Sequence, residues 1–345
     1  MKTINLHKTN LKVVILIFSL FLAILLSIIT CFNFFTNKNN GILKPDHYKI
    51  KENGRWGFIN KKGKIVISPE YEQVYDMYNG LAPVQVKGKW GFINKKGKFI
   101  VEPQYDKAAS FSEGLAAVEK EGKWGYINRK GKLVIEAQFH SASWFSDGLA
   151  AVVKEGKLGF INKKGTMVIE AKYDPIFSSF LNGSAVVSEN GKKFFIDKKG
   201  RKLIDKDFTS LYQFSNGRAF VIDNEKTGYI NKKGTIVIEN VMGEQFSQGL
   251  AAVQRDGKWG YIDTKGRLVI DYQFDSAEKF SEGLAFVVQN KKRGYIDSSG
   301  KMVINLDKAT GYPFTNGIAY VMTNPQDWGY LNKDGEYIWR FKSKK

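Results

Sequence analysis

The sequence predicts an all-β protein, built as a tandem array of about nine three-stranded repeats of ~34 residues that follow an N-terminal transmembrane helix. The array is predicted because GKWGFINKKGK at 88–98 returns as GKWGYINRKGK at 122–132, and weaker copies recur at a similar spacing. The helix is predicted by a long apolar run near the N-terminus. A period of this length is typical of stacked units that cannot bury their apolar faces alone, so we expect residues 48–345 to form one array.

The first element is the apolar segment 13–35, which begins VVILIFSLFLAILLSIIT and follows a tail with three lysines. It is long enough to cross a bilayer, which takes about 20 apolar residues. No A-x-A cleavage site follows, so a single-pass signal anchor is favoured, with residues 1–12 in the cytoplasm and the large domain outside the cell membrane. A cleaved signal and a lipoprotein signal that ends at Cys31 remain alternatives. The polar, turn-rich segment 36–47 is interpreted as a tether.

Each repeat is expected to contribute three strands. In the third copy these are 115–122 with its turn, 123–128 and 132–139, which are apolar, aromatic and β-branched runs bounded by Gly and Asn. A glycine ends the N-K-K-G turn in every copy and is expected to adopt a left-handed conformation. The motif F-S-x-G-L-A, as at 111–116, carries small residues at fixed places and is expected to join neighbouring units. With Cys31 as the only cysteine, the array has no disulfide, and packing must stabilise it.

Comparison of the internal copies separates a core from a rim. One position is always Phe or Tyr, namely Phe58, Phe92, Tyr126, Phe160, Phe195, Tyr229, Tyr261, Tyr295 and Tyr330. Two residues earlier the copies have Trp56, Trp90, Trp124, Trp259 and Trp328, but Leu158, Lys193, Thr227 and Arg293 elsewhere. Because a buried site accepts lysine or arginine only at a high cost, the Phe/Tyr row is expected in the core and the Trp row at its rim.

The motifs KWGYINRKGK and FSEGLAAV resemble the bacterial WG repeat, also called the KWG repeat. The resemblance covers residues 48–345 and departs from the family where the tryptophan is lost. It implies an all-β tandem array in an exported or membrane-attached protein, and it implies no common activity. An open β-solenoid is favoured over a closed, propeller-like ring, because a propeller blade usually needs about 40 to 50 residues.

Charge gives the sharpest functional indication. The net charge is +19, of which +5 lies in the first 45 residues. Cation pairs in the turns are expected to form a basic row along one edge of the array: Lys61 and Lys62, Lys95 and Lys96, Arg129 and Lys130, Lys163 and Lys164, Lys198 and Lys199, Lys232 and Lys233. Acidic residues form a counter-row at Glu102, Glu136, Glu170, Asp205, Glu239 and Asp271.

These observations predict an exported, membrane-tethered binding or scaffold module. Its candidate ligand-binding residues are the cation pairs together with Trp56, Trp90 and Trp124. Its expected partners are the membrane, through 13–35, and an anionic envelope polymer, lipid headgroups or an envelope protein. Two structural alternatives stay open: the cations protect sheet edges, and the tryptophans pack over neighbouring glycines.

Other functional classes are disfavoured. The three histidines lie in the tail, in the tether and in a variable part of one repeat, and no metal-ligand spacing, nucleophile elbow or phosphate loop is present. We therefore expect no enzyme, no metal and no cofactor. Nucleic acid is a poor partner for an exported domain that carries no known recognition motif. A lipoprotein-anchored structural or adhesion protein is the first alternative, and a cell-envelope hydrolase is the second.

Overall fold

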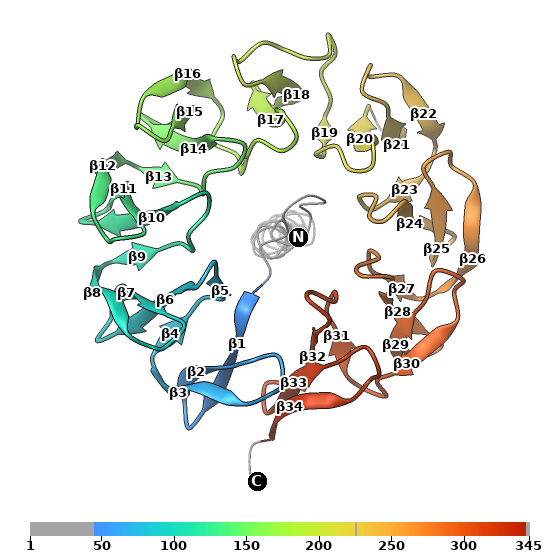
Figure 1. The fold of residues 1–345 in the computed structure, drawn as a ribbon. Coiled ribbons are helices and arrows are strands. Elements are labelled where there is room, and N and C mark those ends of the chain that lie inside the picture. The colour runs from blue at the N-terminus through green and yellow to red at the C-terminus, as the bar shows by residue number, and fades with distance from the viewer. Residues whose placement is uncertain (1–44, 225, 343–345) are drawn as a thin grey trace, which may run out of the picture. The chain divides into compact units, whose positions relative to one another are not determined.

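The computed structural model describes residues 45–224 and 226–342, and every regular element in these ranges is a β-strand. The all-β prediction and the tandem arrangement are confirmed (Figure 1). The predicted cytoplasmic tail, the apolar segment 13–35 and most of the tether lie outside the described residues. Within the described ranges, no helix has the length and apolar character needed to cross a membrane.

The strands fall into four kinds, which recur in the same order along the chain. The first strands are β1 (Pro45–Glu52), β6 (Leu81–Val86), β10 (Leu115–Lys120), β14 (Leu149–Lys154), β17 (Ser184–Glu189), β20 (Ala219–Asp223), β24 (Leu250–Arg255), β28 (Ala285–Gln289) and β32 (Ala319–Asn324). The second strands are β2 (Arg55–Ile59), β7 (Lys89–Asn94), β11 (Lys123–Asn128), β15 (Lys157–Asn162), β18 (Lys192–Asp197), β21 (Lys226–Ile230), β25 (Lys258–Asp263), β29 (Lys292–Ile296) and β33 (Asp327–Leu331). The third strands are β3 (Ile65–Tyr71), β8 (Phe99–Tyr105), β12 (Leu133–Phe139), β16 (Met167–Tyr173), β22 (Ile236–Glu239), β26 (Leu268–Phe274), β30 (Met302–Asn305) and β34 (Tyr337–Lys342). The fourth kind is a two-residue strand, found as β4 (Gln73–Val74), β9 (Lys107–Ala108), β13 (Ser141–Ala142), β19 (Ser210–Leu211), β23 (Met242–Gly243), β27 (Ser276–Ala277) and β31 (Thr310–Gly311), and a further short strand is β5 (Met77–Tyr78).

The three strands expected in each repeat are present in eight of the nine repeats that the described residues form, the fifth repeat lacks its third strand, and the short strand was not predicted. In the third copy, β10, β11 and β12 match the predicted segments within a few residues, and the order of the sheet is β12-β11-β10-β9. The short strand β9 pairs with β10 through only two residue pairs, Val118 with Ala108 and Glu119 with Lys107. Two residues are too few to show period-2 alternation, so sequence patterning could not reveal this strand.

Each first and second strand form an antiparallel hairpin, and nine such hairpins follow one another in the described residues. Most of them form a four-stranded blade with a third strand and a short strand. The first two blades share one larger sheet because β1 also pairs with β5. The first strand begins a few residues earlier than expected, since β1 starts at Pro45 and includes His47, which had been assigned to the tether. Figure 1 shows the short strands around the middle of residues 45–342 and the third strands at the outside.

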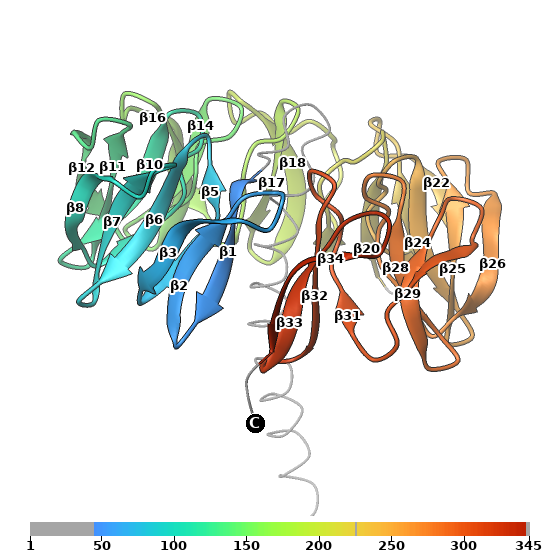
Figure 2. The same cartoon turned by 60° about the horizontal axis from the view of Figure 1, so that its bottom comes forward.

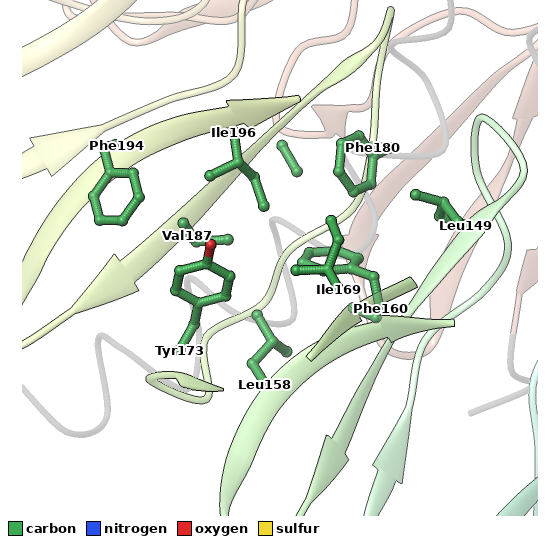
Figure 3. Packing of buried hydrophobic residues seen from close by; sticks show 11 residues of the cluster. Leu149, Leu158, Phe160, Ile169, Tyr173, Phe180, Val187, Phe194 and Ile196 are labelled. Atoms are coloured by element: carbon green, nitrogen blue, oxygen red, sulfur yellow. The ribbon is translucent and has the colours of Figure 1, made fainter. Parts of the chain in front are cut away.

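The hydrophobic core is divided into clusters that lie between neighbouring blades. One cluster joins Leu158, Phe160 and Tyr173 of one blade to Phe180 and Phe194 of the next, as Figure 3 shows. The Phe/Tyr row supplies the centre of these clusters, and Phe58, Phe92, Tyr126, Phe160, Phe195, Tyr229, Tyr261 and Tyr295 have no exposed surface at all. Each blade therefore completes its core only with a neighbour, as expected for a repeat array.

The array closes into a ring, which corrects the preference for an open solenoid. Tyr48 of β1 and Tyr330 of β33 share a hydrophobic cluster, with ring centroids 5.5 Å apart, and the Tyr330 hydroxyl donates to the Lys49 carbonyl at 2.8 Å. Trp56 of the first blade also lies 6.2 Å from Trp328 of the last. The first and last blades thus form the same kind of interface as any other neighbouring pair, and the architecture is the propeller-like alternative (Figure 2).

The glycine of the W-G position permits the close approach of the third strand. A Cβ on Gly125 would lie 2.5 Å from the carbonyl oxygen of Ile135, where the register of β12 against β11 shifts. Gly228 is approached as closely by its third strand without a shift at that position. The corresponding residue in the fifth repeat is Phe194, and there the hairpin β17–β18 has no third strand and is continued only by isolated bridges. The side chain of Phe194 fills part of the core in that blade. The repeat that has Phe194 in place of glycine is thus the repeat whose blade lacks a third strand.

Candidate functional site: the turn face of the ring

The two ends of every hairpin lie on opposite faces of the ring. We call the face with the N-K-K-G turns (60–63, 94–97, 128–131 and their equivalents) the turn face. The face with the loops between first and second strands (53–54, 87–88, 121–122 and their equivalents) is the hairpin face. The second strand runs from one face to the other, as β11 does from Lys123 to Asn128. The predicted cation pairs all lie on the turn face.

The N-K-K-G turn is built by its first and last residues. The Asn128 side-chain oxygen accepts the backbone N–H groups of Lys130 at 3.0 Å and Lys132 at 3.1 Å, and the same bonds recur with Asn or Asp in the other copies. Gly131 has φ +81°, which confirms the predicted left-handed conformation. A Cβ there would meet Val101 of the preceding blade, so this glycine also lies at a blade interface. The turn therefore holds its two middle side chains at a fixed place on each blade.

The first cation of several pairs contacts the neighbouring blade. Lys163 Nζ lies 3.1 Å from Glu113 of the preceding blade, and Lys95 Nζ lies 2.5 Å from Asp46 of β1. Arg129 donates to the Asn79 carbonyl at 2.6 Å, again in the preceding blade. The acceptor side chain also accepts a backbone N–H from its neighbour, as Glu113 does from Gly148 at 3.1 Å. This part of the basic row contributes to the joints between blades.

The second cation of each pair is directed to solvent. Lys62, Lys96, Lys130, Lys164, Lys199 and Lys233 are exposed, and none forms an ion pair with another described residue. Their row is extended by exposed lysines just after the turn glycine, at Lys64, Lys98, Lys132 and Lys301. The seventh blade keeps Lys265 at the second turn position, and the row lapses in the last two blades, which have Ser299 and Asp334 there. We call the six exposed second lysines the basic arc.

The motif F-S-x-G-L-A joins the blades, as predicted, but its glycine has another role. The Ser112 hydroxyl donates to the Phe145 carbonyl of the next blade at 2.7 Å, and the same bond recurs at Ser215, Ser247 and Ser281. Gly114 has no atom near its missing Cβ and has φ +91°. A left-handed backbone, and not close approach of a neighbour, therefore requires glycine there.

The tryptophans do not share a surface with the basic arc. They stand at the start of the second strand, next to the hairpin face. Trp90 and Trp328 are buried, while Trp56, Trp124 and Trp259 are half-buried, so the row mixes core and rim positions. Trp90 stacks on Tyr75 at 4.9 Å with the rings nearly parallel. All five pack within hydrophobic clusters between blades.

On the hairpin face the lysine of K-W-G is neutralised locally. Lys89 Nζ lies 2.5 Å from Asp106, whose other oxygen accepts the backbone N–H of Glu121 in the next blade at 2.8 Å. The Lys89 ammonium and the Glu121 N–H lower the pKa of Asp106 below its ordinary 3.8. Equivalent pairs are Arg55 with Glu72, Lys157 with Asp174, and Lys258 with Asp275. The acidic counter-row lies elsewhere, exposed on or beside the third strands at the outside of the ring.

A smaller charged cluster lies in the loops after two short strands. The pKa values of Glu244 and Glu278 are raised, chiefly because surrounding protein removes water, and burial lowers the pKa of Lys279 to about 8. These loops point toward the middle of the ring (Figure 1). Among the described residues, no group of three or more His, Cys, Asp or Glu side chains could hold a metal ion.

The repeat seen in sequence and structure matches a known family model. The model of the WG containing repeat matches residues 56–90, 90–124, 124–157, 159–192, 194–226, 228–259, 259–292 and 294–324. The chain belongs to the WG-repeat family. Its eight matched WG repeats begin at the tryptophan position of one copy or one residue after it and end at or shortly before that of the next, so each match combines parts of two adjacent blades. No curated protein sequence matches the chain significantly.

Solved structures resemble the WG-repeat ring in fold. A structure described as the eukaryotic initiation factor has a TM-score of 0.61 at 10% identity, covering 86% of this chain and 96% of that one. BamB from Moraxella catarrhalis gives 0.45 at 11% identity, covering 69% and 88%. The dihydro-heme d1 dehydrogenase NirN gives 0.49 at 10% identity, covering 86% and 73%. Only the first is similar enough to support an argument, and at this identity it concerns the fold alone.

Proposed function

We propose that this WG-repeat protein is an exported, membrane-tethered binding module whose basic arc holds an anionic partner of the cell envelope. Segment 13–35 supplies the membrane anchor, segment 36–47 the tether, and the ring a rigid scaffold. Because the six blades of the basic arc carry their lysine at the same place, a partner with repeated negative charges meets one cation on each of these blades. The proposal assigns no catalysis to the ring.

The observation that carries the proposal is the recurrence of an exposed second lysine in all six turns, together with its contrast to the first cation in three of them. Several first cations make contacts that join blades, so structure accounts for them. The second lysines make no such contact, yet they recur in the first six blades on one face, and the seventh blade has Lys265 at the same position. Protection of exposed sheet edges against aggregation does not explain the second lysines, since the turns lie at strand ends and not along the outer edge strands.

The test compares three forms of the full chain held in nanodiscs of neutral phosphatidylcholine. The first is unchanged, the second has the basic arc changed to Gln, and the third has six exposed hairpin-face lysines changed to Gln: Lys87, Lys120, Lys154, Lys192, Lys226 and Lys291. Binding to a soluble glycerol-phosphate polymer and to anionic vesicles is measured at two salt concentrations. We expect the arc variant alone to bind weakly and with a flatter salt dependence. Equal binding by all three forms would contradict the proposal.

A further inference from the structure

The chain enters the ring on the turn face. Strand β1 pairs with β2 from Tyr48 opposite Ile59 to Glu52 opposite Arg55, so it runs toward the hairpin face and its start lies at the other end. Asp46 is fixed there, because its side chain pairs with Lys95 of a turn and accepts the N–H of Gly80 at 2.5 Å. Whatever precedes residue 45 therefore reaches the ring among the basic turns.

The segment between the expected membrane span and the ring is short. Residues 36–44 separate the apolar segment 13–35 from Pro45, and an extended chain of this length reaches no more than about 30 Å. To place the hairpin face against the membrane, this segment would have to pass the ring, whose strands of six to seven residues span about 20 Å. The turn face can meet the membrane without such a detour.

We propose that the ring docks through its turn face on anionic lipid headgroups of the membrane that holds its own N-terminal segment. This inference rests on the proposed function, because the basic arc is the contact surface, and it names lipid as the partner. A flat anionic surface attracts every lysine within a Debye length of about 8 Å at physiological salt. Lysines at the same end of successive blades suit such a surface.

The absence of arc lysines from the last two blades predicts that the docked ring is tilted relative to the membrane. The blades with Lys96, Lys130 and Lys164 carry exposed cations, whereas the last two blades have Ser299 and Asp334 at the same position. The cationic side of the turn face is therefore drawn closer to the lipid than the side with Asp334. A soluble polymer would impose no such tilt relative to a membrane.

The experiment measures which face lies near lipid in the reconstituted full chain. With Cys31→Ser as background, single cysteines are introduced as Thr166→Cys on the turn face or Lys154→Cys on the hairpin face of the same repeat, both at exposed positions. Each is labelled with a fluorophore, and the chain is placed in vesicles that contain a headgroup-attached quencher. We expect several-fold stronger quenching at Thr166 than at Lys154 in vesicles with phosphatidylglycerol. Asp334→Cys should be quenched less than Thr166→Cys.

Two controls test the electrostatic cause. Losing one lysine from an anionic contact weakens docking roughly fivefold, so the arc variant should lose the difference between the two faces. The hairpin-face variant, which here carries the labelled cysteine at Lys154 and Gln at its other five positions, should retain the difference. Raising salt to about 1 M, where the Debye length is about 3 Å, should remove the difference without any substitution. Vesicles of neutral phosphatidylcholine should show little difference from the start.

The outcomes separate the inference from the proposed function. Equal quenching at both positions in anionic vesicles, or stronger quenching at Lys154→Cys, overturns the inference. If the glycerol-phosphate polymer still binds in an arc-dependent way, the proposed function survives that result. If neither polymer nor vesicle binding depends on the arc, both the inference and the proposed function are wrong.

Discussion

Tyr126 and Trp124 stand two positions apart on β11 and differ in what their loss should cost. Tyr126 has no exposed surface, packs on Phe145 at 4.9 Å and donates to the Ser143 carbonyl at 2.7 Å, whereas Trp124 is half-buried. We expect Tyr126→Ala to lower the free energy of unfolding by roughly 3 to 5 kcal/mol and Trp124→Ala to lower it distinctly less. Denaturant unfolding measures both, and equal losses would contradict this distinction.

Trp90 provides a matched control for the half-buried tryptophan. It occupies the position of Trp124 in the preceding blade, but it is only 5% exposed and stacks on Tyr75. Trp90→Ala should therefore resemble Tyr126→Ala more than Trp124→Ala. If Trp90→Ala instead lowers the free energy of unfolding as little as Trp124→Ala does, burial does not control the loss of stability at this position.

Asp106 should make stability depend on pH at the acid end. Its folded pKa is depressed by Lys89 and the Glu121 N–H, so its contribution is present above the unfolded value of 3.8 and is lost as pH falls through the folded pKa. Asp106→Asn should lower the melting temperature at pH 7. The difference from the unchanged chain should shrink as pH falls below 3.8. A difference that stays constant down to the lowest pH tested would show that the carboxylate charge is irrelevant.

Several residue roles were predictable from the sequence and others were not. The Phe/Tyr row and the left-handed turn glycine follow from invariance among the copies. The division of labour within a cation pair does not, because Lys163 and Lys164 look alike in sequence and only their contacts separate them. The burial of Trp90 could not be predicted either, since it depends on Tyr75, a residue that varies among copies.

At the scale of the strand, Gly125 should determine whether β12 keeps its place. An added Cβ would come 2.5 Å from the Ile135 carbonyl oxygen, so Gly125→Ala must displace the third strand. We expect faster amide hydrogen exchange across Leu133–Phe139, with smaller changes in Leu115–Lys120. Exchange followed by mass spectrometry gives this resolution.

Gly122→Ala is the control for that change. Gly122 has φ +75° and nothing within reach of an added Cβ, so alanine there costs backbone strain of about 1 to 2 kcal/mol without a clash. Its effect should concentrate in the hairpin turn and leave β12 protected. If both variants expose β12 alike, the glycine is not a spacer for the third strand.

The sequence predicted the long strands because their apolar runs and turn residues repeat in every copy. It did not predict that the fifth blade lacks a third strand, since 201–208 still contains apolar residues at comparable spacing. The difference lies in the contact between strands, where Phe194 replaces glycine. Such a contact becomes visible only when the two segments are seen side by side.

For the whole molecule, the expectation of an open stack depended on repeat length. Four full strands need about 40 to 50 residues, but here the innermost strand is only two residues long, so about 34 residues suffice for a blade. Closure also depends on a small, constant rotation from each blade to the next. No local pattern in the sequence reports that rotation, because it is set by packing across every interface.

Gly63 offers a direct test of ring closure. It is the turn glycine of the first blade, with φ +79°, and an added Cβ would collide with the Ile338 carbonyl of the last blade. Gly165 is its equivalent within the array, with φ +82° and Ile135 of the preceding blade 3.1 Å from an added Cβ. Gly156, with φ +76°, has nothing nearby. All three share the same backbone strain, and only the first two add a clash between blades.

In a closed ring, Gly63→Ala and Gly165→Ala should both lower the free energy of unfolding more than Gly156→Ala does. In an open stack, Gly63 would have no preceding blade, and Gly63→Ala would cost no more than Gly156→Ala. Denaturant unfolding of the three single variants distinguishes these cases without any change to the basic arc. In a ring the first and last blades pack against each other, so damage at their interface affects both. The Gly63→Ala variant should therefore also expose β1 and β33 to hydrogen exchange together, although they lie at opposite ends of the array in sequence.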